Sequence, residues 1–458
     1  MSDRRASKPV GALEIAAFAA PAAPLLALTL PTIIFLPPHY ITELGLSEKV
    51  VAGIFLAARV FDLFLDPLMG TLQDRTKTRF GRRRIWLAGA CPPLMAAIWY
   101  VFIYLGPGAG VAAAALGIFA MYFVFAMMMV AHLGWSGELI PTYQGRTRVL
   151  GAVQTASLLG EVALLLTPAI VKLNHGTDAQ SIAAMGWAMI IMLPTTTALA
   201  IFGARDRDAP PQAHFSMLAG IRTVLGNKTA RRVLIPDLLL GIAQGVSGGL
   251  FLFYFRFVLG FEHESEALVL IYFVAGLLGV PVWWSIAQRF GKDKALMTAF
   301  VYSATTTLLL LVMPHGAFAI VAAFMVVVGL SQGGLILLTR TLMADVVDED
   351  ELASGSRRSG IFFGLMLTTS KVGLASGPLA YAVLQTLGFQ ATLGADNAPQ
   401  ALMSLSVIFI GVPVLLCTLG AISMRHYPLD EKVQAALAAA IAFRHSENSE
   451  NTLGPSTK

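Results

Sequence analysis

The stretch from Gly110 to Ala131, "GVAAAALGIFAMYFVFAMMMVA", contains no charged residue. An α-helix rises about 1.5 Å per residue, so a helix of this length covers the roughly 30 Å of hydrocarbon in a bilayer. We therefore predict a transmembrane helix here.

The rest of the chain has the same character. Of its 458 residues, 56% are hydrophobic and only 13% are charged, whereas soluble proteins carry about 25% charged residues. Both cysteines, Cys91 and Cys417, fall inside apolar runs, which argues against a disulfide framework. Hydropathy predicts an all-α integral membrane protein with twelve transmembrane helices, near 11–36, 47–73, 84–105, 109–133, 146–172, 182–203, 233–260, 265–288, 294–313, 316–344, 357–388 and 399–424.

A short internal repeat indicates two pseudo-symmetric halves of six helices. "RFGRRR" at 79–84 and "RFGKDK" at 289–294 each follow the second span of a half. The predicted domains are a cytoplasmic N-terminus, an N-terminal half, a cytoplasmic linker, a C-terminal half and a partly disordered cytoplasmic tail, at 1–10, 11–203, 204–232, 233–424 and 425–458.

Lysine and arginine positions predict the orientation. With the N-terminus inside, only Lys49 and Lys172 fall on the outer side, and cytoplasmic loops are where basic residues accumulate. We expect a multi-pass protein of the bacterial inner membrane with both termini in the cytoplasm. The start of the chain lacks the features of a cleavable signal, so the first span is expected to be retained. The net charge of +5 reflects this topology and gives no case for nucleic-acid binding.

Several motifs resemble a known transporter family. Gly70, Asp74 and Arg75 in "GTLQDR" resemble the loop signature of the major facilitator superfamily. The wider stretch "ARVFDLFLDPLMGTLQDRTKTRFGRRR" at 58–84 resembles the glycoside-pentoside-hexuronide:cation symporters. The blocks "GELIPTYQGRTRVLGA", "MADVVDEDELASGSRRSGIFFG" and "TTSKVG" agree with that family. The resemblance implies the major facilitator fold and cation-coupled symport of a sugar, glycoside or uronate by alternating access.

Two acids within one apolar run form the predicted cation-coupling site. Asp62 and Asp66 are four residues apart and so share a helix face, to which Arg59 also belongs. Two close carboxylates in a low dielectric cannot both stay ionised cheaply, so they must take up a proton, a metal cation or a basic partner. The resemblance implies that Lys371 is the opposing charge. The alternative is a fixed network in which Arg59 and Lys371 only neutralise the acids.

The identity of the coupling ion stays open between H+ and Na+. Relatives with a sodium site often have Asn or Thr directly before the second acid, where this chain has Leu65. Sodium needs several oxygen ligands and a proton needs one carboxylate, so the sequence favours H+. We expect no other metal than a possible Na+ at Asp62 and Asp66, and no cofactor.

The substrate residues are less clearly marked. Sugar carriers that the chain resembles have acids on spans one and four, and here neither span supplies one at depth. The remaining candidates for the substrate cavity are Arg59, His132, Trp135, Gln154, Glu161, Gln244 and Arg256. Four of these residues have structural alternatives. His132 is then a hydrogen-bonded histidine of the core, and Trp135 is an ordinary packing residue. Glu161 is then a protonated carboxyl group satisfied by a neighbouring helix, and Arg256 extends towards the lipid headgroups. The shortage of acids keeps a second cargo open, a lysolipid or other amphipathic molecule.

The predicted gating residues lie around the loop after the second span and around the connection between spans ten and eleven. The resemblance implies that Gly70, Asp74 and Arg75 close the cytoplasmic side, and that Asp345, Arg357 and Arg358 act comparably in the second half. The alternative for the basic loop is that it only obeys the positive-inside rule and contacts anionic lipid.

Enzymatic function finds little support. "GPGAG" at 106–110 is a tight turn without the strand and acidic residue of a dinucleotide site, and no nucleophile elbow or metal-spaced cluster occurs. We expect a transporter with a small-molecule substrate, embedded in the lipid bilayer and functional as a monomer. A transporter-like sensor that binds without translocating is the further alternative.

Overall fold

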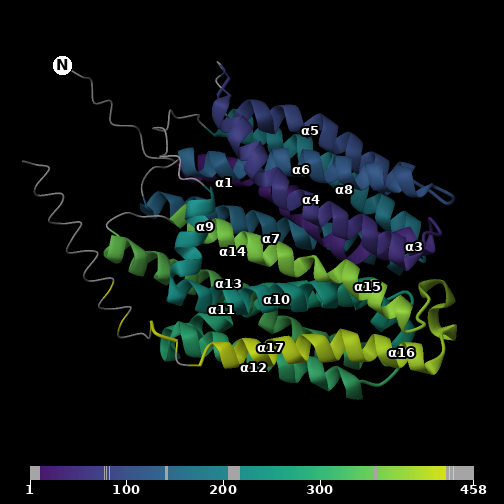
Figure 1. Cartoon of the computed structure of the whole chain (residues 1–458). Coiled ribbons are helices and arrows are strands. Elements are labelled where there is room, and N and C mark those ends of the chain that lie inside the picture. Colours follow the sequence, from purple (N-terminus) through teal and green to yellow (C-terminus); the bar gives the residue numbers. More distant parts are fainter. Residues whose placement is uncertain are drawn as a thin grey trace, which may run out of the picture. The chain divides into compact units, whose positions relative to one another are not determined.

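The computed structural model describes residues 11–76, 78, 80–81, 83–139, 143–204, 217–354, 359–425, 427–429, 433 and 437. Within these ranges every regular element is a helix and no strand occurs (Figure 1). The α-helices are α1 Ala12–Ala19, α2 Ala22–Ala27, α3 Leu36–Thr42, α4 Glu48–Arg75, α5 Arg84–Trp99, α6 Val111–Leu139, α7 Tyr143–Leu173, α8 Asp178–Gly203, α9 Met217–Gly226, α10 Lys228–Phe253, α11 Ser265–Phe290, α12 Lys292–Leu308, α13 Phe318–Ser354, α14 Ser359–Leu374, α15 Ser376–Thr386, α16 Pro399–Ser406 and α17 Val412–Ser423.

Short π- or 3-10-helical segments continue several of these helices. They are η1 Pro31–Phe35, η2 Tyr100–Tyr104, η3 Tyr254–Val258, η4 Leu309–Val312, η5 Ala391–Asp396 and η6 Val407–Gly411. Four of them, η1, η2, η3 and η6, are π-helical, and such segments often occur at functional sites.

The predicted membrane helices are confirmed. Among the described residues, eleven helical segments are long and apolar enough to cross a bilayer, and each overlaps a predicted span. The remaining predicted span, 47–73, corresponds to α4, a helix of 28 residues whose hydropathy is lowered by Arg59, Asp62 and Asp66. The first span continues to Thr42, beyond its predicted end near residue 36, and so includes His39.

The chain forms two compact units, and the first comprises 1–212, 248–270 and 378–402. In this unit α4 packs against α6, and α5 packs against α6 and α8 (Figure 1). Helix α2 packs against α7. Small residues allow the closest approaches: a Cβ on Gly160 of α7 would lie 2.3 Å from the backbone oxygen of Ala23 on α2. Small residues at such contacts are typical of membrane helices, whose association depends on close packing.

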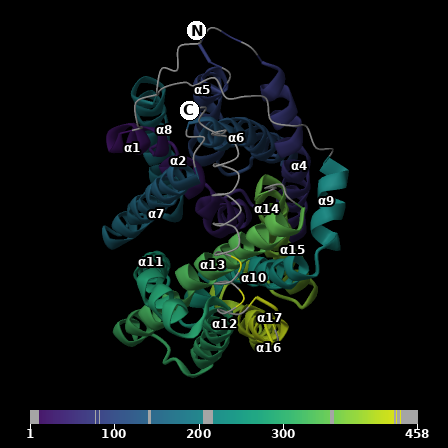
Figure 2. The ribbon, with the colours of Figure 1, turned by 90° about the vertical axis from the view of Figure 1, so that its left-hand side faces the viewer.

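The second unit comprises 213–247, 271–377 and 403–458. Here α12 packs against α13 and α17, around a core that contains Phe300, Leu338 and Leu342. Figure 2 shows α10 beside α14. These two helices meet through glycines, because a Cβ on Gly373 would lie 2.6 Å from the carbonyl carbon of Gly241.

Candidate functional site

The predicted acid face of α4 lies inside unit 1. Ser47 caps the helix by accepting from the amide of Val50 at 3.4 Å, and α4 then runs without interruption to Arg75. Asp62 is only 1% exposed, Arg59 is buried and Asp66 is half-buried. The helical repeat therefore brings the two carboxylates and the guanidinium to one largely buried face, as the spacing predicts.

Arg59 is held against α6 beside a small cavity. Its guanidinium carbon lies 5.3 Å from the centroid of the Tyr122 ring, a cation–π contact that orients the side chain. The cavity has a volume of about 20 Å³, room for about one water molecule, and its lining is Leu28, Thr29, Thr32, Arg59, Met121, Tyr122 and Phe125. Arg59 is thus the residue of the acid face that lines the cavity, and its positive charge shares a helix side with the carboxylates of Asp62 and Asp66.

Gln154 and Glu161, two of the predicted substrate-cavity residues, lie on α7 together with Ser157. The Ser157 hydroxyl donates to Glu161 Oε1 at 3.0 Å, and Ser157 is buried while Gln154 and Glu161 are half-buried. Gln244, on α10 in unit 2, is also half-buried. These side chains provide hydrogen-bonding groups at membrane depth.

His132 and Trp135 on α6 both pack against Phe18 on α1. His132 Nε2 lies 2.8 Å from the Phe18 carbonyl oxygen, and its ring stacks on the Phe18 ring with centroids 4.7 Å apart. The Trp135 ring meets Phe18 edge to face at 5.3 Å, and the Arg84 guanidinium lies 5.3 Å from the Trp135 centroid. Both side chains are buried. This is the arrangement expected if the two rings serve packing.

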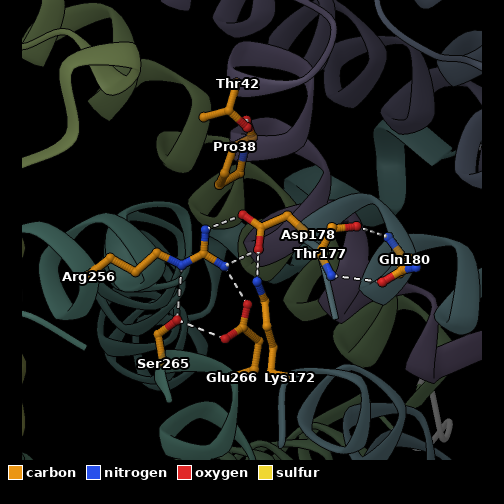
Figure 3. Close-up of polar contacts among 9 residues, drawn as sticks. All are labelled: Pro38, Thr42, Lys172, Thr177, Asp178, Gln180, Arg256, Ser265 and Glu266. Atoms are coloured by element: carbon orange, nitrogen blue, oxygen red, sulfur yellow. Dashed lines mark hydrogen bonds and ion pairs between the residues drawn. The ribbon is translucent and has the colours of Figure 1, made fainter. Parts of the chain in front are cut away.

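Arg256 is the centre of an ion-pair network within unit 1 (Figure 3). Its guanidinium donates to Asp178 Oδ2 at 2.5 Å and Oδ1 at 3.2 Å, to Ser265 Oγ at 3.0 Å, and to Glu266. Lys172 pairs with the same Asp178. The Arg256 side chain is 12% exposed, so these partners largely enclose it, and it does not extend towards the lipid headgroups.

The network joins the α7–α8 connection to η3 and the start of α11. A capping box fixes the beginning of α8: the Thr177 amide donates to Gln180 Oε1 at 2.9 Å, and the Gln180 amide donates to Thr177 Oγ1 at 3.2 Å. Asp178 is thereby held in the first turn, where negative charge is favoured. Sequence reasoning named Arg256 and missed its partners, although Lys172 is one of the two basic residues predicted outside.

The end of α4 is attached to α6 by a residue that sequence reasoning also missed. Gln73, in "GTLQDR", is fully buried; its Nε2 donates to the Met127 carbonyl at 2.8 Å, and its Oε1 accepts from Arg83 at 3.2 Å. Of the predicted gating residues beside it, Gly70 is half-buried on α4 and Arg75 is exposed. Asp74 lies on α4, but its side chain is outside what the structure describes.

The predicted residues of the second half lie in unit 2. Asp345 on α13 accepts from Lys292 Nζ at 2.7 and 2.9 Å, so the "RFGKDK" segment is joined to α13. Lys371 lies on α14, and its pairing with the acids of α4 stays a prediction. Arg357 and Arg358 lie outside the described residues. The described part of the chain contains no group of three or more His, Cys, Asp or Glu side chains arranged to hold a metal ion.

Comparison with known proteins identifies the family. The description "MFS/sugar transport protein" matches residues 17–431. The chain belongs to this family. The family of transporters that the motifs predicted is thus confirmed, and with it the multi-pass membrane location.

Named relatives agree with this membership. The inner membrane symporter YicJ of Escherichia coli is 26% identical over 400 residues, 85% of each chain. The putative glycoside/cation symporter YagG of the same organism is 24% identical, over 90% of this chain and 91% of its own. The human sodium-dependent lysophosphatidylcholine symporter 1 is 24% identical, over 83% of this chain and 76% of its own.

Solved structures confirm the major facilitator fold. The nucleoside transporter NupG aligns with a TM-score of 0.63 at 14% identity, over 91% of this chain and 100% of its own. A D-xylose-proton symporter aligns with a TM-score of 0.59 at 12% identity, over 90% and 97%. At these identities the likeness concerns the fold alone.

Proposed function

We propose that this protein is a secondary transporter that couples the entry of H+ or Na+ to the uptake of a sugar, glycoside or uronate. The observation that carries the proposal is the buried face of α4, where Asp62, at 1% exposure, shares a helix side with Asp66 and Arg59. Intramembrane acids are costly and mark ion or substrate pathways. The names of YicJ and YagG support symport, and that of YagG supports a glycoside as cargo.

The acid pair explains how an ion drives the cycle. A bound cation neutralises the repulsion between Asp62 and Asp66, so the loaded site crosses the occluded state at lower cost than the charged one. Lys371 is proposed to pair with Asp62 and Asp66 when the ion is absent. One positive charge moving through 100 mV is worth about 2.3 kcal/mol, enough for roughly fifty-fold accumulation of a neutral solute.

The Arg256 network is proposed to close the outer end of the pathway. In the predicted topology, with both termini in the cytoplasm of a bacterium, the α7–α8 connection and the start of α11 lie on the outer side. Ion pairs among Lys172, Asp178, Arg256 and Glu266 hold these segments together. Opening this end requires those pairs to break or exchange. On the other side, Gly70, Asp74, Arg75, Asp345, Arg357 and Arg358 are proposed to gate the cytoplasmic end in a monomeric transporter.

Transport by proteoliposomes tests the proposal. Purified protein is reconstituted, an inward pH or Na+ gradient is imposed, and the uptake of labelled glycosides and uronates is measured. Asp62→Asn and Asp66→Asn are each expected to abolish uphill uptake while solute exchange persists. Asp396→Asn, at an exposed position of η5, is the matched control and should transport normally. Uphill, ion-driven uptake by Asp66→Asn would show that the coupling role is wrong.

A lysolipid or other amphipathic cargo is the second candidate. It is favoured by the similarity to the human sodium-dependent lysophosphatidylcholine symporter 1. Thermal unfolding separates the two, since a ligand that binds the native state raises the melting temperature. Glycosides, uronates and lysolipids are added one at a time, with and without Na+. A shift with lysolipid and none with any glycoside or uronate would replace the sugar assignment.

A further inference from the structure

Asp237 on α10 is a buried acid that the proposed coupling site does not use. It is 5% exposed and lies in the membrane span Lys228–Val258, in the part up to Ser247 that belongs to unit 2. It lies nine positions after Lys228, the first residue of α10, and therefore about 14 Å along the helix. A carboxyl group at this depth needs partners, because the surrounding hydrocarbon offers none.

Two hydroxyl groups of α14 face this carboxyl group. Thr369 Oγ1 lies 2.7 Å and Ser370 Oγ lies 2.9 Å from the same oxygen, Asp237 Oδ2. Gly241 and Gly373 permit this contact, because they let α10 and α14 approach until their backbones touch. The acid is therefore enclosed by the helix interface.

Each hydroxyl group has a second acceptor within reach. Thr369 Oγ1 lies 2.8 Å and Ser370 Oγ lies 3.1 Å from the Met366 carbonyl oxygen, one turn earlier on α14. A hydroxyl group has a single proton to donate and can also accept. When Asp237 is ionised, both hydroxyl groups donate to it. When it is protonated, it donates to one hydroxyl group, which turns its own proton to Met366.

The charged groups to consider around Asp237 are basic residues of α10, α13 and α14. Arg340 on α13 lies near enough to act on it electrostatically. On α14, Lys371 directly follows Ser370, and on α10 itself Arg231 and Arg232 are exposed in the first turns. Its side-chain hydrogen bonds with Thr369 and Ser370 come from neutral hydroxyl groups. The hydroxyl pair, which suits both protonation states, is therefore its immediate environment.

We propose that Asp237, Thr369 and Ser370 form a second proton-binding site, in unit 2, besides the acid pair of α4. The site takes up a proton on the Asp237 carboxylate and releases it again, while the two hydroxyl groups reverse their hydrogen bonds. Its use in the transport cycle rests on the proposed function, whereas the binding of the proton itself does not.

The spacing of the oxygens favours a proton over Na+. The oxygens of Asp237, Thr369 and Ser370 are separated by 2.7 and 2.9 Å, which are hydrogen-bond distances. A hard cation about 2.4 Å from each ligand would hold neighbouring oxygens roughly 3.4 Å apart at right angles. Binding Na+ would thus require the two helices to move apart.

Infrared difference spectroscopy of the purified protein tests the proposal. Spectra of the wild type and of Asp237→Asn are recorded between about pH 5 and about pH 9. The spectrum of the variant is subtracted from that of the wild type, and the carboxylic C=O region of the difference is compared across pH. We expect the variant to lack one carboxylic C=O band, and we expect the intensity of that band in the wild type to change with pH within this range. Asp396→Asn is the control, because it removes an exposed acid of η5 that lies outside this site. An Asp237 band that is absent, or constant, throughout the range overturns the proposal.

A second variant keeps Asp237 and removes its two hydroxyl partners. It therefore also tests the proposal if Asp237→Asn folds poorly. In Thr369→Val/Ser370→Ala the ionised carboxylate loses both donors, so the midpoint of the band should move towards alkaline pH by about one unit or more. Thr339→Val is the control, because the hydroxyl group of Thr339 bonds within its own helix. An unmoved midpoint contradicts the proposed role of the hydroxyl groups.

Two further results separate this site from the proposed function. If Na+ removes the Asp237 band at constant pH, the ligand is Na+ and the assignment of a proton is wrong. If Asp66→Asn still drives uphill uptake, the proposed coupling site fails, yet the titrating band of Asp237 would be unaffected. The proton site at Asp237 and the coupling site on α4 are therefore tested by different measurements.

Discussion

Replacing Arg256 tests how much the ion-pair network contributes to stability. In Arg256→Met the guanidinium is lost, and Glu266, only 1% exposed, keeps the Ser265 hydroxyl group as a donor at 2.9 Å. Asp178, which is 27% exposed, keeps its pairing with Lys172. The uncompensated charge is thus mainly that of Glu266.

The magnitude follows from this burial. Removing one partner of a buried ion pair costs about 3–5 kcal/mol, whereas an exposed pair is worth about 0–1 kcal/mol. We expect a loss of about 3 kcal/mol for Arg256→Met, because Glu266 is buried and keeps only one neutral donor. For Lys172→Met we expect a smaller loss, since Asp178 is partly solvated and retains Arg256.

Thermal unfolding in detergent is the assay, with the double variant Arg256→Met/Glu266→Gln as the decisive sample. Neutralising Glu266 removes the orphaned charge, so the double variant should be more stable than Arg256→Met. An equal or lower melting temperature for the double variant would refute the reasoning. So would an Arg256→Met protein as stable as the wild type.

Two further predictions concern helix contacts. Gly373→Ala should destabilise the protein by about 1–3 kcal/mol, because the new Cβ meets the backbone of Gly241. Gly364→Ala on the same helix meets nothing within 4 Å and should be neutral, so equal melting temperatures for the two variants would contradict the close packing. Gln73→Leu should cost about 1–3 kcal/mol, because the buried Gln73 side chain donates to the Met127 carbonyl and accepts from Arg83. Chemical denaturation measures this loss, and an unchanged midpoint would show that these contacts are unimportant.

The sequence alone determined the helices and the acid face of α4. Spans follow from local hydropathy, because each must bury its own backbone polar groups in the bilayer. The face shared by Asp62, Asp66 and Arg59 follows from the 3.6-residue repeat, which needs no knowledge of any other helix. Both features depend on residues within a few turns of each other.

Only the tertiary structure revealed the partners of the other buried polar groups. Asp237 meets hydroxyl groups more than 130 positions later in the chain, and Arg256 meets Asp178 78 positions earlier. A single acid in an apolar run carries no sign of which distant helix will supply its donors. That choice is made by close helix contacts such as the one between Gly241 and Gly373, since packing decides which side chains face each other.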